Sequence, residues 1–113
     1  MLCNSEKVSY EVREGALLIR VRGEIDHHSA VLVRAGIDSE ILAKRPQKVL
    51  LELSAVDFMD SSGLGLIMGR YALIKQYGGV LEVVNPSSAV VKIMKLAGME
   101  RIIPITQIKE KKE

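Results

Sequence analysis

Val49-Leu50-Leu51-Glu52-Leu53 is a short and almost wholly apolar stretch, which is typical of a strand covered on both faces of a sheet. After Asp60 the apolar residues recur at helical spacing, and Gly78-Gly79 ends that pattern. Together they predict a buried strand that leads into an amphipathic helix, the unit that alternates along the chain in α/β proteins. The residues of the helical stripe are Leu64, Ile67, Met68, Tyr71 and Ile74.

The residues that precede this unit predict a hairpin and a first helix. Apolar and polar residues alternate on both sides of Glu14-Gly15, as they do in two antiparallel strands joined by a short turn. From about Ser29 the period becomes helical, and Pro46 lies at the helix end or just past it. The alternating residues are Val8, Tyr10, Val12, Leu17, Ile19 and Val21, and the helical ones are Ala30, Val33, Ile37 and Ile41.

The residues that follow predict one more strand and helix. Val80-Leu81-Glu82-Val83-Val84 has the composition of another buried strand, and Asn85-Pro86-Ser87 is a turn that leads into a third helix. Gly98 ends this helix, and three isoleucines beyond it indicate a last short strand. The helical stripe comprises Val90, Ile93, Met94 and Ala97, and the isoleucines are Ile102, Ile103 and Ile105.

The order ββαβαβαβ predicts a single α/β domain. We expect a mostly parallel mixed sheet with an N-terminal antiparallel hairpin and with helices packed on it. In such sheets, functional groups gather where the chain leaves the carboxyl ends of the strands. These exits are residues 23–28, 54–62 and 85–88.

Length and composition agree with one ordered domain. The chain has 113 residues, of which 48% are hydrophobic and 27% charged. A formal charge of only +2, with one Phe, three Tyr and no Trp, argues against a nucleic-acid surface, which needs a basic stripe and stacking rings. We expect residues 1–6 to be a flexible N-terminus and residues 107–113 to form a polar tail or a short helix.

Cysteine content and hydropathy indicate the compartment. Cys3 is the one cysteine of the chain, so no internal disulfide can form, and a reducing compartment fits best. No apolar run approaches the roughly 18 residues that a membrane helix needs, and no secretory signal is visible. We therefore expect a soluble cytoplasmic protein that needs no cofactor and binds no membrane.

The junction between the central strand and its helix carries the chemistry. Ser61 or Ser62 is expected at the helix N-cap, where a hydroxyl accepts a hydrogen bond from a backbone N–H. Gly63 and Gly65 leave the first turn bare, so another molecule could approach the backbone. A phosphoryl group on Ser61 would meet the free N–H groups and the positive end of the helix dipole, which favour an anion.

Two segments resemble those of a known family. Phe58-Met59-Asp60-Ser61-Ser62-Gly63-Leu64-Gly65, which continues through Gly69-Arg70-Tyr71, resembles the signature of the bacterial anti-sigma factor antagonists of the STAS-domain class. Gly23-Glu24-Ile25-Asp26-His27-His28 resembles their second characteristic segment. The resemblance runs from about Val8 to Ile105 and is strongest to the sporulation members. The chain departs from the family in its short polar C-terminus, where a fuller helix is usual.

The resemblance implies a phosphorylation-controlled binding protein rather than an enzyme. In this family the unphosphorylated antagonist binds an anti-sigma factor that is also a serine kinase, and the sigma factor is released. The kinase then uses ATP to phosphorylate the serine that corresponds to Ser61, the phosphoprotein dissociates, and a separate phosphatase restores it. The free antagonist is expected to be a monomer, and its target is expected to be sporulation transcription.

The residues expected to contact the partner lie in both segments and on the following helix. Gly65, Gly69 and Ala72 are small and spaced by three or four residues, which fits either close packing against the sheet or an exposed docking surface flanked by Arg70. Asp26 and Asp60 are either partner-binding residues or helix-start carboxylates. The full expected set is Asp26, Asp60, Ser61, Ser62, Gly63, Gly65, Leu66, Gly69, Arg70 and Leu73.

Parts of the sequence are also compatible with other functions. The same fold could serve as a STAS interaction module of a general stress-response pathway, in which only the partner would differ. A Ser–His–Asp hydrolase could be written from Ser61, His27 or His28, and Asp26, but the chain has no Gly-x-Ser-x-Gly elbow. Nucleotide binding is disfavoured because this chain lacks the Gly-x-x-x-x-Gly-Lys motif of phosphate-binding loops. Metal binding is disfavoured because the adjacent histidines point in different directions.

Overall fold

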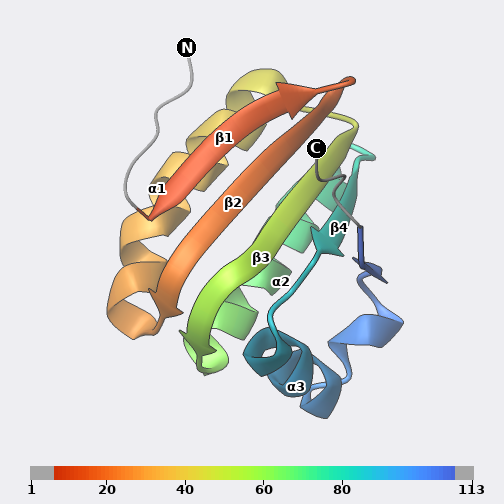
Figure 1. Ribbon diagram of the computed structural model, residues 1–113. Helices are drawn as coiled ribbons and strands as arrows, with labels where there is room; N and C mark the ends of the chain where they lie inside the picture. Colours follow the sequence, from red (N-terminus) through yellow and green to blue (C-terminus); the bar gives the residue numbers. More distant parts are fainter. Residues whose placement is uncertain (1–6, 109–113) are drawn as a thin grey trace, which may run out of the picture.

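The computed structural model describes residues 7–108 and contains a five-stranded sheet of order β1-β2-β3-β4-β5. β1 pairs antiparallel with β2, and every other pair is parallel, as predicted. Helices α1 and α2 lie side by side on one face of the sheet, and α3 lies at the end where β3 terminates (Figure 1). The elements are β1 Val8–Arg13, β2 Ala16–Ile25, α1 His27–Lys44, β3 Lys48–Met59, α2 Ser61–Gln76, β4 Val80–Val84, α3 Ser88–Leu96, the 3₁₀ turn η1 Met99–Arg101 and β5 Ile105–Thr106.

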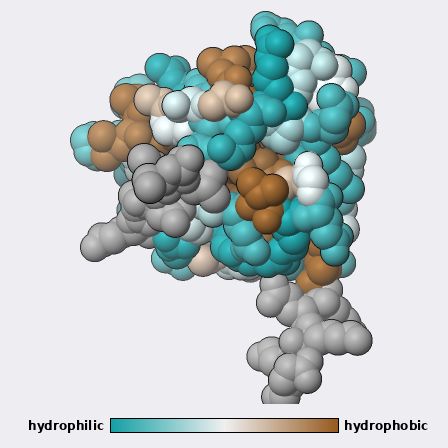
Figure 2. All heavy atoms as spheres, turned by 90° about the horizontal axis from the view of Figure 1, so that it is seen from above, coloured by the Kyte–Doolittle hydropathy of each residue, from teal (hydrophilic) through white to brown (hydrophobic). Residues whose placement is uncertain are grey.

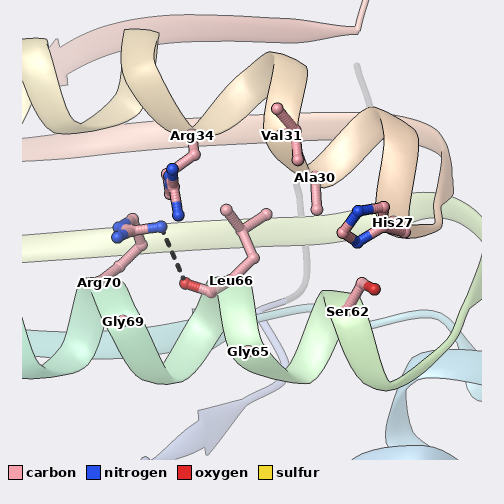
Figure 3. Close-up of a pocket in the computed structure, with 9 residues that line it drawn as sticks. All are labelled: His27, Ala30, Val31, Arg34, Ser62, Gly65, Leu66, Gly69 and Arg70. Carbon is pink, nitrogen blue, oxygen red and sulfur yellow. Dashed lines mark hydrogen bonds between the residues drawn. The ribbon is translucent and has the colours of Figure 1, made fainter.

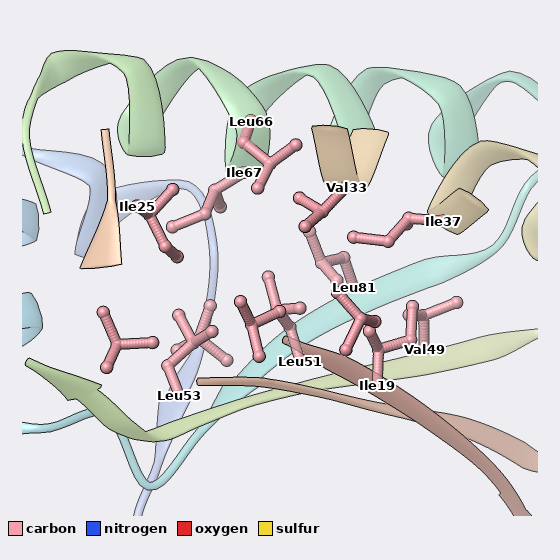
Figure 4. Packing of buried hydrophobic residues seen from close by; sticks show 14 of the residues in the cluster. Ile19, Ile25, Val33, Ile37, Val49, Leu51, Leu53, Leu66, Ile67 and Leu81 are labelled. Carbon is pink, nitrogen blue, oxygen red and sulfur yellow. The ribbon is translucent and has the colours of Figure 1, made fainter. Parts of the chain in front are cut away.

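The hydrophobic core fills the space between the sheet and the two long helices (Figure 4). Ile37 and Ile41 of α1, Ile74 of α2 and Val83 of β4 have no exposed surface. Each such side chain contributes about 1.5–3 kcal/mol to folding by leaving water. The sheet and both helices therefore form one rigid base for the loops at the carboxyl ends of the strands.

β3 is longer than its apolar stretch predicts. The strand runs for 12 residues rather than the five from Val49 to Leu53. Its second half pairs with β2 alone, past register shifts after Arg20 and Gly23, whereas β4 has already ended opposite Glu52. Because this half lacks a neighbouring strand on one side, several of its residues are exposed. The apolar pattern therefore did not reveal that the strand continues beyond Leu53.

The parallel pairing of β2 with β3 places two helix starts side by side. Ile25 and Met59, the last residues of the two strands, are register partners. The backbone N–H of Asp60 donates to the carbonyl of Ile25 over 3.3 Å. Asp26 and Asp60 follow these partners directly, so the two carboxylates lie at the same edge of the sheet.

Asp26 begins α1 through a capping box. Its Oδ1 accepts from the backbone N–H of Ser29 (3.0 Å), and the hydroxyl of Ser29 accepts from the N–H of Asp26 (2.9 Å). This reciprocal pair starts the helix at His27, two residues before its apolar period becomes visible. The backbone N–H of Ser29, and after it the Ser29 hydroxyl, which also lies 3.1 Å from Oδ1, hold the pKa of Asp26 below its usual value of 3.8 because they favour the ionised carboxylate.

Gly63 lies where α2 approaches the end of β3. A Cβ built on Gly63 would lie 2.3 Å from Cγ of Met59, which is too close for two carbon atoms, whereas one on Gly65 would have nothing within 4 Å. Gly63 is therefore needed for packing inside the protein, which differs from the expectation that it leaves the backbone bare. Gly65, by contrast, is exposed.

Ser87 joins α3 to the half of β3 that pairs with β2 alone. Its hydroxyl accepts from the N–H of Val90 as the N-cap of α3 (3.4 Å) and donates to the carbonyl of Val56 (2.7 Å). Its own N–H donates to the carbonyl of Leu53 (3.2 Å). One serine thus satisfies two strand carbonyls that no neighbouring strand reaches.

The C-terminal strand is shorter than predicted. Residues 99–101 form a 3₁₀ turn, and only Ile105 and Thr106 pair with β4. Ile103 has no exposed surface and belongs to the core, so its apolar character reflects burial rather than strand pairing. Residues 107 and 108 form neither helix nor strand. The remaining expectations, for residues 1–6 and for the rest of the tail, lie outside the described residues.

We predict that Asp26→Ala unfolds at a lower urea concentration than the wild type at neutral pH, because the cap is lost. The pKa of Asp26 is lower in the folded state than its usual 3.8, so the cap stabilises the fold above the unfolded-state pKa and is lost as the pH falls through the folded-state pKa. The gap between the two urea midpoints should shrink below pH 3.8. Circular dichroism at a series of pH values measures it. Asp57→Ala, which removes an exposed carboxylate, is the control, and a gap that persists in acid would contradict the assignment.

The two glycines of α2 provide a matched pair of substitutions. Alanine adds similar helix propensity at either position, but at Gly63 it must displace Met59, and overpacking of this kind costs about 1–3 kcal/mol. Gly65→Ala should therefore exceed Gly63→Ala in unfolding free energy by about 1–3 kcal/mol. Urea unfolding of both variants measures the difference, and equal stabilities would show that Met59 yields freely.

Candidate functional site: the first turn of α2 and the groove beside it

Ser61 is the first residue of α2 and is exposed. The N-cap is Asp60, whose Oδ1 accepts from the backbone N–H of Ser62 over 2.8 Å. The expectation that Ser61 or Ser62 caps the helix was therefore wrong, since an aspartate caps as well as a serine and comes one residue earlier. Within residues 7–108 the hydroxyl of Ser61 forms no hydrogen bond, so it is available to another molecule.

Two capping carboxylates lie on either side of this edge. Asp26 and Asp60 each accept a hydrogen bond from the helix that they start, and both are only partly buried. They lend negative charge to the positive ends of the two helix dipoles. A further anion on Ser61 would therefore add charge to an edge that already carries two carboxylates.

A groove of about 320 Å³ runs between α1 and α2 and begins next to Ser61 (Figure 3). Ser62 and His27 face each other at one end, and the side chains of Arg34 and Arg70 approach each other at the other end. Between them the lining is small and apolar. The residues that line the groove are His27, Ala30, Val31, Arg34, Ser62, Gly65, Leu66, Gly69 and Arg70.

Arg70 connects the two helices from inside this groove. Its Nε lies 2.8 Å from Oδ1 of Asp38 on α1, and its guanidinium also donates to the carbonyl of Leu66 over 3.3 Å. The residue is only 8% exposed. Burial lowers the pKa of Arg70, the carboxylate of Asp38 opposes that change, and the neighbouring Arg34 adds to it.

The structure gives different surroundings to the residues expected to contact a partner. Gly65 is exposed and Gly69 half-buried, and both lie along the groove with open space beside them rather than packed on the sheet. Leu73 is half-buried. Three of the expected residues are buried, namely Gly63, Leu66 and Arg70. In the free chain they support the surface from below and contribute little exposed area to it.

Sequence reasoning missed the part of the groove that α1 supplies. His27, Val31, Arg34 and Asp38 recur at spacings of three and four, so they share the side of α1 that lies along α2. That periodicity was available from the sequence. The pairing of Asp38 with Arg70 was not, because it depends on how the two helices lie against each other.

Other parts of the described chain offer less to a ligand. The end of the molecule seen from above, where β1 turns into β2, is largely hydrophilic with hydrophobic residues in separate patches (Figure 2). Among residues 7–108, no three His, Cys, Asp or Glu side chains are grouped as a metal ion would need. No helix in this part of the chain is long and apolar enough to cross a membrane.

Curated relatives align with most of this chain. The chain is 38% identical over 99 residues to the anti-sigma F factor antagonist of Paenibacillus polymyxa, an alignment that covers 88% of this chain and 85% of that protein. It is 30% identical over 99 residues to the anti-sigma-B factor antagonist of Bacillus subtilis, covering 88% and 89%.

Solved structures share the fold. The anti-sigma factor antagonist SpoIIAA in its unphosphorylated form aligns with a TM-score of 0.78 and 30% identity, over 91% of this chain and 89% of that one. The phosphorylated form of SpoIIAA, described as a Bacillus cell fate determinant, aligns with a TM-score of 0.71 and 29% identity, over 91% and 92%. The sequence profile of the STAS domain matches residues 7–111. Profile, relatives and fold agree, and the chain belongs to the STAS-domain family.

Proposed function

We propose that this protein is an anti-sigma factor antagonist that is switched off by phosphorylation of Ser61. Its unphosphorylated form binds an anti-sigma factor serine kinase in the cytoplasm and causes release of the sigma factor. The kinase phosphorylates Ser61 with ATP, the complex dissociates, and a serine phosphatase restores the active form. The protein itself acts as ligand and substrate rather than as a catalyst.

The observation that carries the proposal is the exposed hydroxyl of Ser61 at the start of α2. Asp60 already caps the helix, so Ser61 can be modified without loss of a hydrogen bond that the fold needs. The likeness to SpoIIAA, a protein solved in both phosphorylated and unphosphorylated forms, supports a switch of this kind.

Electrostatics explains how one phosphoryl group could end the interaction. Phosphorylation adds about −1.5 to −2 charges to an edge where Asp26 and Asp60 are already placed. A partner fitted around a bare hydroxyl would meet added bulk and a charge that it must desolvate. A loss of about 4 kcal/mol weakens binding roughly a thousandfold, which is enough for a switch.

The proposed contact surface extends from this edge along α2. Asp26, Asp60, Ser61 and Ser62 form its rim, and Gly65, Gly69 and Leu73 continue it along the helix. The buried residues of the set would act through shape, since they hold the first turn of α2 on β3 and α2 against α1. These are Gly63, Leu66 and Arg70.

Two kinds of sigma factor are candidates for the one that this protein regulates. The greater identity to an anti-sigma F factor antagonist favours regulation of sporulation, whereas the likeness to an anti-sigma-B factor antagonist supports a general stress response. A hydrolase is a weaker candidate, because Oδ1 of Asp26 accepts from Ser29 instead of orienting a histidine. Titration against both kinds of anti-sigma factor separates the first two.

We predict that the cognate anti-sigma factor kinase and ATP place one phosphoryl group on this protein, at Ser61. Ser61→Ala should accept none, and its complex with the kinase should persist in the presence of ATP. Ser62→Ala is the matched control and should still be phosphorylated. Mass spectrometry of the digested protein locates the group. Phosphate on Ser62 of the Ser61→Ala variant, or turnover of ATP without the kinase, would contradict the proposal.

A further inference from the structure

At the far end of the groove between α1 and α2, positively charged side chains outnumber negatively charged ones. Arg70 has a counter-ion in Asp38, with 2.8 Å between Nε and Oδ1. Arg34 lines the same end, and within residues 7–108 no carboxylate lies at ion-pair distance from it. This end of the groove therefore holds two guanidinium groups and one carboxylate, which pairs with Arg70 alone.

The two arginines oppose each other in the free chain. Their side chains approach across the groove (Figure 3). Burial is the main cause that lowers the pKa of Arg70, and the charge of Arg34 lowers it further. Arg70 is also shielded from water, which weakens the screening of this repulsion. An anion placed between the two guanidinium groups would relieve the repulsion, and a carboxylate matches their planar donors.

The remainder of the groove suits the aliphatic part of a side chain. Gly65 and Gly69 leave open space beside α2, and Ala30 and Leu66 complete an apolar lining. Val31 adds an apolar rim that is 52% exposed. Ser62 lines the near end and follows Ser61 in the chain, so the groove opens next to the serine that the partner is proposed to reach.

We propose that the groove receives an acidic side chain of the anti-sigma factor kinase, whose carboxylate pairs with Arg34 and Arg70 while its methylene groups lie over Gly65 and Gly69. This inference rests on the proposed function and adds the chemistry of one contact. It assigns Arg34, which lies outside both segments of the family signature, to partner recognition.

The test is a titration of the purified kinase, without ATP, against charge-reversal variants of the full chain. Arg34→Glu should weaken binding by about tenfold or more, because it places a like charge opposite the partner's carboxylate. Arg13→Glu reverses an exposed arginine that pairs with Glu11 at the far end of the sheet, and it should bind as the wild type does. Gly69→Leu, which fills the groove without changing any charge, should also weaken binding.

Each variant is checked for its circular dichroism spectrum and for phosphorylation of Ser61, which reports the proposed function separately. Wild-type affinity in both Arg34→Glu and Gly69→Leu, with Ser61 still phosphorylated, overturns the groove assignment and leaves the switch intact. Self-association of the wild type that Arg34→Glu abolishes also overturns it, because the occupant would be a second copy. If the wild type itself neither binds nor is phosphorylated, the proposed function fails and the groove assignment fails with it.

Discussion

The parallel pairing of β2 with β3, maintained to the last residue of each strand, is the constraint on which the site depends. Ile25 lies opposite Met59, and the N–H of Asp60 donates to the carbonyl of Ile25. Both chains therefore turn into helices at the same height on the sheet. The two capping carboxylates, the exposed serine and the groove between the helices all follow from that one alignment.

A division of labour at the start of α2 makes Ser61 available. Helix starts leave backbone N–H groups unpaired, and a serine is often used to satisfy one of them. In this chain Asp60 performs that task, and Asp26 performs it for α1. The hydroxyl that follows is thus unnecessary to the fold, and a group attached to it would change the surface while the helix cap stays in place.

Periodicity in the sequence was sufficient for the hairpin, the three helices, the order of elements along the chain and the edge at which the candidate site lies, because each of these elements has its own apolar pattern. Periodicity was insufficient where a strand pairs on one side only, where a residue is buried outside a helix or strand, and where two helices contact each other. The second half of β3 pairs on one side only, so its exposed residues interrupt the pattern. Ile103 is buried without being paired. The contact between Arg70 and Asp38 joins residues 32 positions apart by their numbers on two helices, and no local pattern announces it. The sequence located Ser61 at the start of α2 correctly. It did not show that Asp60, rather than a serine, is the N-cap, because both residue types are common at that position.

The three hydrogen bonds of Ser87 limit which residues can replace it. Asparagine, aspartate, threonine and serine are all accepted at helix N-caps in general. At this position the side chain must accept from Val90 and also donate to the carbonyl of Val56, and an ionised carboxylate has no proton to give. The interchange of serine and aspartate that most helix starts tolerate is therefore closed at position 87, because the joint between α3 and the strand that leads to Asp60 requires a side chain that both accepts and donates a hydrogen bond.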